Sequence, residues 1–458
     1  MAAPDLDALA RELSGCVLTG AEILEAARAD KSGYVSTGPP LALVEAGTIA
    51  DVQATMRFAS EHGIPVVPRG AGTGLAGAAT GGPGEIVLST LAMNEVLEIS
   101  TTDLLAVVQP GVINGDLNDQ LAPLGLWFAP DPASRAISTV GGNIATNAGG
   151  LLCMKYGVTR EAVLGLTVVL ADGRLLELGR RSVKGVTGYD LTALMVGSEG
   201  TLGVIVEATV RLRPLPVGEV ATLSAAFEDV VAGATAASAL VAAGVDCAVL
   251  ELLDGACMAA LESYWGRDLG GGALLIAQLD GGAAEQEAGR AGELLRMCGG
   301  RVEVTRDRDR GEELFAVRRS LHFAIERLGT VLIEDVAVPR SALGAMFEAI
   351  GEIERRYGIS IPTVAHAGDG NLHPNLVVAT EPGADPNEVP DHIWAAADEL
   401  FSACLRLGGT LTGEHGVGLL KKRWLRDELG QDSYDLQRDL KAVFDPQGIL
   451  NPGKVYEW

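Results

Sequence analysis

Apolar and polar positions in the first seventy residues alternate in a way that predicts two strands with a helix between them. Residues 41–46 and 64–67 are short apolar runs typical of strands. Between them, apolar residues at helical spacing follow Thr48 and Asp51, a capping-box variant that starts a helix, and Gly63 marks its end. We therefore expect a strand–helix–strand unit, which is right-handed where such connections occur.

The pattern changes beyond Pro214 and Pro216, where long helices alternate with strands. Helices are predicted at 227–244, 283–298, 311–328, 341–357 and 391–407, and strands at 248–253, 273–279, 331–338 and 361–379. The polar segment 380–390 is predicted to be a loop. At roughly 100–200 residues per domain, 458 residues suggest two or three domains. We expect an N-terminal half over 1–215, a second half over 216–405, and a C-terminal segment over 406–458 that completes the site.

Charge and cysteine content exclude several classes of protein. The chain has 60 acidic and 35 basic residues, a net charge of −25, which is unlike a nucleic-acid binder and is repelled by an anionic membrane. Its six cysteines form no C-x-x-C pair, so neither a zinc ribbon nor an iron–sulfur ligand run is present. The longest uncharged stretch, 230–245, is shorter than the roughly 20 residues of a membrane span and predicts a buried helix. With no signal-peptide pattern at its start, the sequence favours a soluble cytoplasmic protein that meets a membrane only through a partner.

Three runs of small residues, at 69–77, 138–150 and 197–203, interrupt the first half and predict loops. The first contains G-x-G-x-x-G over 72–77, but a dinucleotide fingerprint needs a helix next, and 78–84 holds four helix breakers before a strand. A Rossmann fold is therefore disfavoured. Backbone N–H groups in such loops can still bind anions. Three of them indicate an extended ligand lying against backbone, with flexible surface loops as the alternative.

In this order the runs resemble the FAD-binding half of the vanillyl-alcohol-oxidase type of flavoproteins, and most of all the branch of the D-2-hydroxyacid dehydrogenases, which includes D-lactate dehydrogenase and the glycolate oxidase FAD subunit. The matching runs are PRGAGTGLAG, GGNIATNAGG, KYG, VKGVTGYDL and GSEGTLGVI. The resemblance implies an α+β fold, with an FAD-binding domain of two α/β subdomains and an α+β cap domain whose antiparallel sheet is flanked by helices.

The same resemblance assigns residues to the cofactor. They are Arg69, Gly70, Ala71, Gly72, Thr73, Gly74, Leu75, Asp131, Ser134, Thr139, Gly142, Asn143, Thr146, Asn147, Gly149, Gly200, Gly203, Ile205 and Asn451. Some relatives attach the flavin covalently through a histidine in the first loop. Thr73 occupies the matching position here, which implies non-covalent FAD.

A predicted hairpin around Gly368–Asn371 brings two histidines together. With that four-residue turn, His366 pairs with His373, and directly opposite residues share a face with Cβ atoms about 4.5–5.5 Å apart. Two imidazoles at that separation can share a metal. Asn375 should point to the same side, and Pro374 indicates an edge strand. The alternative is a pair of surface histidines.

Glu414 and His415 form a charged pair between glycines, which indicates a loop end; a solvated turn is the alternative. Two imidazoles and a carboxylate suit a catalytic Zn²⁺, with Mn²⁺ or Fe²⁺ left open. The resemblance implies that His366, His373 and Glu414 are metal ligands. It also implies that Asn375 contacts the substrate and that His415 is the catalytic base.

Arg318 lies in a helical stretch among apolar neighbours, and a guanidinium fork suits a carboxylate. The resemblance places a substrate-binding arginine at this position, and His322, one turn later, is expected to share its face. The alternative is an ordinary surface arginine beside Arg319. The run 333–339 departs from hydroxyglutarate-type relatives, which argues against a second, distal carboxylate on the substrate.

These features predict flavin-dependent oxidation of a small D-2-hydroxy acid to the 2-oxo acid, with the metal assisting deprotonation of the hydroxyl. The alternatives are a non-catalytic FAD-binding subunit, a flavin-dependent alkyl transferase of the same superfamily, and an NAD enzyme. The electron acceptor must be external: an iron–sulfur subunit, an electron-transfer flavoprotein, a quinone or a cytochrome. The particular acid, oxygen reactivity and oligomeric state stay open.

Overall fold

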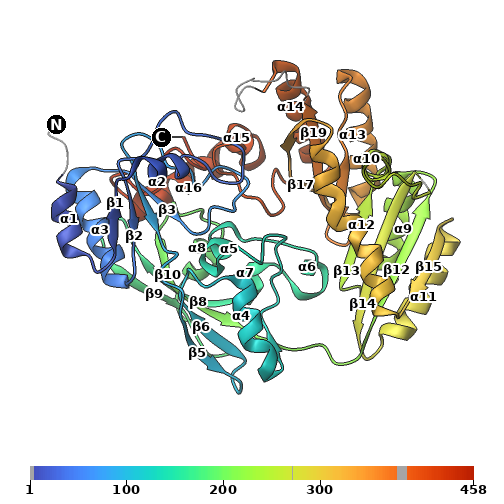
Figure 1. Ribbon diagram of the computed structural model, residues 1–458, viewed down its shortest axis with the longest axis horizontal. Coiled ribbons are helices and arrows are strands. Elements are labelled where there is room, and N and C mark those ends of the chain that lie inside the picture. Colours follow the sequence, from blue (N-terminus) through green and yellow to red (C-terminus); the bar gives the residue numbers. More distant parts are fainter. Residues whose placement is uncertain (1–4, 271, 379–388, 458) are drawn as a thin grey trace. The chain divides into compact units, whose positions relative to one another are not determined.

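The computed structural model describes residues 5–270, 272–378 and 389–457, so most of the predicted loop at 380–390 lies outside the described residues. The chain divides into two compact units. The first unit comprises residues 1–150, 157–215 and 414–458, and the second comprises 151–156 and 216–413. Each is described by itself below (Figure 1).

The first unit contains two main sheets. A four-stranded sheet has the order β1-β2-β4-β3, and a five-stranded antiparallel sheet has the order β5-β6-β10-β8-β9. The strands are β1 (Cys16–Leu18), β2 (Ala42–Glu45), β3 (Val66–Arg69), β4 (Ile86–Ser89), β5 (Val96–Ser100), β6 (Leu105–Val108), β8 (Val163–Val169), β9 (Leu175–Gly179) and β10 (Val204–Arg211), with a small pair of β7 (Leu126–Trp127) and β11 (Arg213–Pro214). In the first sheet, β2 and β3 both run parallel to β4.

The helices of the first unit are mostly short. They are α1 (Leu6–Glu12), α2 (Ala21–Ala26), α3 (Ile49–His62), α4 (Asn114–Leu121), η1 (Ala122–Leu124), α5 (Val140–Thr146), α7 (Thr159–Ala162), α8 (Leu191–Met195), α15 (Lys422–Leu429) and α16 (Gln431–Phe444). Helix α3 starts with the predicted capping box of Thr48 and Asp51 and ends at Gly63 in the left-handed conformation, so that prediction is confirmed. Its residues Val52 and Met56 are fully buried in one of the cores of the unit.

The prediction of a loop over 138–150 was wrong, because its middle folds into helix α5. The Thr139 hydroxyl accepts a hydrogen bond from Gly142 N and caps the helix start, and Asn147 (φ 51°) ends it in the left-handed region. The burial of Val140 and Ile144 against the five-stranded sheet outweighs the poor helix propensity of the glycines. By contrast, residues 70–85 contain no helix and lead into β4, as predicted.

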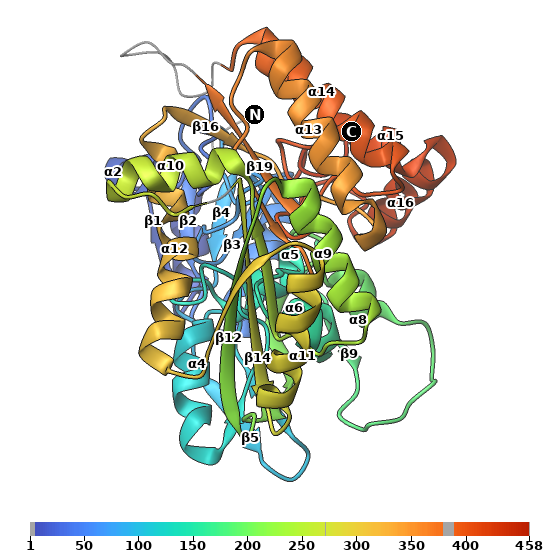
Figure 2. The ribbon, with the colours of Figure 1, turned by 90° about the vertical axis from the view of Figure 1, so that its right-hand side faces the viewer.

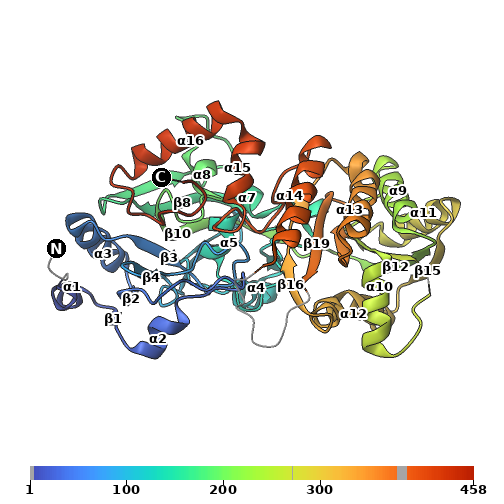
Figure 3. The same ribbon diagram turned by 90° about the horizontal axis from the view of Figure 1, so that it is seen from above.

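The second unit is built on one large antiparallel sheet with the order β15-β12-β14-β13-β18-β19-β16, and β17 also pairs with β19. Its strands are β12 (Glu219–Phe227), β13 (Val249–Leu253), β14 (Ala273–Gly281), β15 (Arg301–Thr305), β16 (Thr330–Ile333), β17 (Val336–Ala337), β18 (Thr363–His366) and β19 (Asn371–Val378). Its helices are α6 (Cys153–Tyr156), α9 (Val230–Ala242), α10 (Gly255–Trp265), α11 (Ala284–Met297), α12 (Arg308–Glu326), η2 (Arg340–Ala342), α13 (Leu343–Tyr357) and α14 (Asp391–Arg406). Figures 2 and 3 show α10 and α12 on one side of the sheet and α9, α11 and α13 on the other.

The short segment 151–156 belongs to the second unit although both flanking segments belong to the first. Lys155 Nζ lies 2.7 Å from Asp246 Oδ2 and 2.8 Å from Asp280 Oδ1. The Tyr156 hydroxyl donates to Asp280 Oδ2 at 2.7 Å. Leu151 and Leu152 pack against the apolar cluster under α10 and α12. Six residues therefore connect to the second unit by both charged and apolar contacts.

Candidate active site

The hairpin of β18 and β19 carries the two predicted histidines in a register that differs from the prediction. The four-residue turn is 367–370, so His366 pairs with Asn371 and His373 pairs with Val364. The predicted direct pairing of His366 with His373 was wrong. Asn371 belongs to the strand because its side-chain amide donates to Asp335 Oδ1 at 2.7 Å and to the Val336 carbonyl at 2.9 Å. A shift of two positions keeps both histidines on one face, and their ring centroids lie 5.0 Å apart.

Pro374 does not mark an edge strand, which corrects that prediction. Strand β19 is internal, with β18 on one side and β16 and β17 on the other. The Pro374 carbonyl accepts a hydrogen bond from Glu334 N at 2.9 Å, opposite the break between β16 and β17. The sheet therefore accommodates a residue without an N–H where the neighbouring ladder is already interrupted.

Behind His366 lies a fully buried carboxylate, Glu251, on β13. The two residues are register partners across β13 and β18, and His366 Nδ1 lies 2.5 Å from Glu251 Oε1. Burial would raise the pKa of Glu251, but the charges and hydrogen bonds of His366 and Arg318 outweigh it and lower that pKa below its ordinary value. An ionised carboxylate only accepts hydrogen bonds. The proton of His366 therefore sits on Nδ1, and Nε2 is the atom suited to bind a cation.

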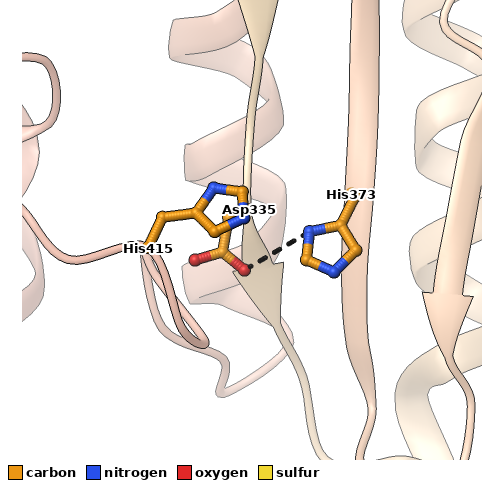
Figure 4. A group of neighbouring side chains, drawn as sticks. All are labelled: Asp335, His373 and His415. Carbon is orange, nitrogen blue, oxygen red and sulfur yellow. Dashed lines mark ion pairs between the residues drawn. The ribbon is translucent and has the colours of Figure 1, made fainter. Parts of the chain in front are cut away.

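His373 has a similar arrangement with a second buried carboxylate. Its Nδ1 lies 3.7 Å from Asp335 Oδ1 (Figure 4). The Thr412 hydroxyl donates to the other oxygen of Asp335 at 2.6 Å and helps to fix it. A histidine whose second ring nitrogen faces a carboxylate is the usual form of a metal-ligating histidine.

Glu414 and His415 come directly after Gly413, the last residue of the second unit. Thr410 forms a bridge with Ala337, and a Cβ on Gly413 would lie 2.3 Å from the Asn371 amide, so this part of the chain passes close along the sheet. Within the second unit, the imidazoles of His366 and His373 have ring centroids 5.0 Å apart and lie beside the carboxylate of Asp335. Two imidazole nitrogens and a carboxylate oxygen are the donor set of many catalytic zinc sites. These residues therefore fit a divalent cation.

Arg318 projects from α12 toward the same buried glutamate. Its Nε donates to Glu251 Oε2 at 2.7 Å, and 22% of its side chain is exposed. Arg319 is mostly exposed and pairs with Glu312. Of the two neighbouring arginines, only Arg318 joins the histidine network.

The other two residues predicted to contact the substrate, His322 and Asn375, differ in their burial and in their partners. His322 has 60% of its side chain exposed and pairs with Glu326 at 3.0 Å, so the structure does not bring it to the network. Asn375 is buried, and its amide nitrogen donates to the carbonyls of Pro362 and His373. Only its amide oxygen is available for another donor.

Glu251 and Asp335 were missed by the sequence reasoning. Both lie inside apolar strand-forming runs: Glu251 is the one acid in VLELL, and Asp335 follows Glu334 in VLIEDVAV. An acid in such a run must be paired when it is buried, and that signal points to a polar network.

In the first unit, the predicted cofactor loops lie against one another. A Cβ on Gly70 would lie 2.5 Å from the Thr139 hydroxyl, and one on Gly200 would lie 3.1 Å from Pro68. Arg69 donates to the Ala79 carbonyl at 2.7 Å and covers Gly72, which has a positive φ of 67°. The backbone thus packs too closely at these positions for larger residues.

Several buried polar atoms near these loops have no hydrogen-bond partner among the described residues. They are Thr80 Oγ1, Ser138 Oγ, Asn143 Nδ2 and Asn451 Oδ1. Beside Gly74, a Cβ would meet no protein atom within 4 Å. Buried polar groups are normally paired, so these atoms and this open backbone fit a polar ligand such as a dinucleotide.

The other predicted cofactor residues take part in the same loops. Asn147 Oδ1 accepts a hydrogen bond from Arg160 N, and Thr146 Oγ1 bonds to the Gly142 carbonyl. A Cβ on Gly149 would lie 2.4 Å from Glu414 Oε2. The remaining members are Ala71, Thr73 and Leu75 in the first loop, Asp131 and Ser134 in the segment before α5, Gly203 before β10 and Ile205 within it.

Glu199, in the third loop, connects these loops to the C-terminal segment. Its carboxylate accepts hydrogen bonds from Val417 N at 2.7 Å and Gly418 N at 2.9 Å. Complete burial raises the pKa of Glu199 to about 7, although these two N–H groups act in the opposite direction. Asn451 donates to the Glu199 carbonyl at 2.7 Å and to the Ala78 carbonyl at 3.0 Å, which joins the first and third loops.

Comparison with known proteins identifies the family. Residues 40–179 match the model of the FAD binding domain, and residues 218–455 match the model of the C-terminal domain of FAD linked oxidases. The chain is 42% identical to glycolate oxidase subunit GlcD of Bacillus subtilis, over 91% of this chain and 89% of that protein. It is 33% identical to a D-lactate dehydrogenase of Anaerostipes hadrus, over 96% and 94% of the two chains.

The chain belongs to the FAD-linked oxidase family. It is an FAD-linked oxidoreductase, and the predicted family resemblance is confirmed.

Solved structures confirm the predicted fold of this FAD-linked oxidase. Its chain superimposes on p-cresol methylhydroxylase with a TM-score of 0.76 at 18% identity, covering 96% of this chain and 93% of the other. A 4-ethylphenol oxidase of Gulosibacter chungangensis gives 0.74 at 20% identity, covering 96% and 94%. The fold is the vanillyl-alcohol-oxidase type of FAD-binding domain with a second domain on a large antiparallel sheet. Among the described residues, no helix is both long and apolar enough to cross a membrane.

Proposed function

We propose that this FAD-linked oxidase converts a small D-2-hydroxy acid, of the D-lactate or glycolate type, to the 2-oxo acid. The observation that carries the proposal is the pair of histidines on one sheet face, each with Nδ1 toward a buried carboxylate, together with Arg318 on the same network. Relatives that share a third or more of the sequence are called glycolate oxidase subunit and D-lactate dehydrogenase. Their names and this polar network support the same substrate class.

In this proposal His366, His373 and Glu414 hold a divalent cation, and this set of ligands suits Zn²⁺. The loop residues given above hold FAD without a covalent bond, because Thr73 has no nucleophilic ring nitrogen. When bound, FAD supplies the acceptor for the hydride of C2, and the cation supplies Lewis acidity at the hydroxyl oxygen.

Two other residues act on the substrate directly. Arg318 binds the carboxylate with the amino groups of its guanidinium fork, while its Nε stays on Glu251. His415 accepts the hydroxyl proton, for which an imidazole is well matched near neutral pH, and such catalysis contributes about 10²–10⁴ in rate. Residues 406–458 complete the site in this scheme, since they carry both Glu414 and His415.

The electrons must leave the flavin through an external acceptor. None of the six cysteines forms a disulfide, and none belongs to a cluster of potential metal ligands among the described residues. We therefore propose an acceptor outside this chain: an iron–sulfur subunit, an electron-transfer flavoprotein, a quinone or a cytochrome.

A substrate panel tests the function. The purified protein is loaded with FAD and zinc, and reduction of an artificial dye is followed with D-lactate, glycolate, L-lactate and D-2-hydroxyglutarate. We expect rapid reduction with D-lactate or glycolate and little with the other two. No reduction with any 2-hydroxy acid, by protein that has full flavin and metal content, would contradict the proposal and favour a non-catalytic subunit or an alkyl transferase.

A further inference from the structure

Glu251 contacts both the proposed cation ligand His366 and the proposed substrate-binding residue Arg318. Its side chain is completely buried on β13, and each of its two oxygens faces a different donor: Oε1 is 2.5 Å from His366 Nδ1, and Oε2 is 2.7 Å from Arg318 Nε. His366 comes from β18 and Arg318 from α12. No other described carboxylate forms an ion pair with Arg318.

We propose that Glu251 is a positioning residue that serves the cation ligand and the substrate-binding arginine at once. The inference rests on the proposed function and adds a role that its reacting groups do not include. Glu251 touches neither substrate nor flavin in this scheme. It sets which ring nitrogen of His366 carries the proton and which edge of the Arg318 guanidinium is already occupied.

The chemistry of the carboxylate explains why one residue can do both. A carboxylate has two acceptor oxygens and no proton to donate, so it fits two donors on opposite sides. Because Nδ1–H of His366 is held, its Nε2 lone pair is available in the correct tautomer for a cation. Because Nε–H of Arg318 is held, the two terminal amino groups form the remaining fork for a carboxylate.

The sheet register makes this arrangement rigid. Glu251 and His366 are direct partners between β13 and β18, and Leu252 and Leu253 pair in the same register with Ala365 and Val364. A glutamine at position 251 has the same size, but it offers one acceptor and one donor group. Its N–H₂ group faces one of the two donors, and the other donor keeps only a neutral acceptor in place of a charged one, so both contacts weaken.

Zinc titration and substrate kinetics test the proposal together. Glu251→Gln should bind zinc about 10–100-fold more weakly than the wild-type protein, the usual effect of losing the partner of a ligating histidine. It should also raise KM for the preferred 2-hydroxy acid about tenfold when zinc is saturating. Glu251→Asp, which keeps the charge, should recover part of the zinc affinity.

The matched control is Glu303→Gln. It removes a carboxylate partner of Arg310, which lies on helix α12 as Arg318 does, and this ion pair is exposed. It should change zinc affinity and KM less than twofold. A Glu251→Gln protein with unchanged zinc affinity, or with only one of the two parameters altered, would overturn the shared role.

A measurement on the wild-type chain keeps the test independent of how well variants fold. Nitrogen-15 NMR of the metal-free protein, with the His366 signal assigned by its absence in His366→Gln, should show the Nδ1–H tautomer. The Nε2–H tautomer would overturn the proposal. Neither the tautomer measurement nor the zinc titration needs a substrate. If no hydroxy acid is oxidised, the proposed function is refuted. The tautomer and the zinc affinity still decide the role of Glu251.

Discussion

In the proposed function, the cofactor loops of the first unit and the histidine network of the second bind their ligands by different means. The loops use backbone and small residues, with closely packed glycines such as Gly70 and unpartnered polar atoms such as Asn143 Nδ2. The network uses polar side chains on a sheet: His366 Nδ1 lies 2.5 Å from the buried carboxylate of Glu251, and His373 Nδ1 lies 3.7 Å from that of Asp335. The loop contacts are encoded in short contiguous runs, whereas the network depends on strands more than a hundred residues apart. Changes in one region should therefore leave the other intact.

The largest expected effect comes from removing a cation ligand in the network. His373→Gln should lose bound zinc and lower kcat about 10⁴-fold, since a Lewis acid contributes several kcal/mol to such a step. Flavin content should stay normal, because the loops do not use this residue. Metal analysis, flavin absorbance and dye reduction measure the three quantities. The exposed His62 provides the control variant His62→Gln, and a fully active, zinc-loaded His373→Gln protein would refute the cation role.

Removing His415, the proposed base, should leave both zinc and FAD bound. His415→Gln is expected to retain zinc and FAD and to lower kcat about 10³-fold, within the usual contribution of general base catalysis. The wild-type rate should fall at low pH as the base becomes protonated, and this limb should vanish in the variant. A pH profile of kcat that is identical in both proteins would assign the proton to another group.

Glu199 allows the stability of the first unit to be tested on its own. Its pKa in the folded protein is about 7, above the ordinary 4.5, so folding favours the protonated form. Its stabilising contribution is therefore complete below pH 4.5 and is lost as the pH rises through 7, by about 3 kcal/mol in all. Urea unfolding of the apoprotein between pH 4.5 and 8 should show this decline in the wild type and a flatter course in Glu199→Gln. Glu61→Gln, at an exposed position, should follow the wild type, and equal slopes in all three proteins would contradict the assignment.

The smallest expected effect concerns the flavin alone. A side chain at position 74 meets no protein atom within 4 Å, so Gly74→Val should fold normally. It should nevertheless weaken FAD binding about tenfold, or about 1.4 kcal/mol, by occupying space beside the exposed backbone. Fluorescence titration with FAD measures this, and zinc affinity should be unchanged. Gly282→Val, at a similarly open turn in the second unit, is the control; equal FAD affinity in both variants would remove Gly74 from the binding surface.

Much of the fold was predictable because its signals are local. The capping box of Thr48 and Asp51 fixed the start of α3, and periodic apolar residues gave the long helices of the second unit within a few residues. Helix α5 was missed because its glycines suggest a loop, while its stability comes from burial of Val140 and Ile144 in a core that only the folded chain forms. Tertiary packing outweighed local propensity there.

The candidate site was predictable in part for the same reason. The two histidines lie on adjacent strands, so a turn signal was enough to place them on one face, although the register was off by two because Asn371 is held by Asp335. Glu251 could not be placed, since its contact with His366 spans 115 residues and depends on the order of strands in the sheet. A long-range pairing of this kind leaves no periodic trace in the sequence.

The segment 151–156 has a consequence for how such enzymes can diversify. Because these residues belong structurally to the second unit but are encoded within the first, the two halves are not separable modules in the gene. A chimera that exchanges only residues 216–413 would bring in foreign partners for Lys155 and Tyr156 in place of Asp246 and Asp280. A replacement of the second unit that keeps these contacts must therefore transfer residues 151–156 together with residues 216–413.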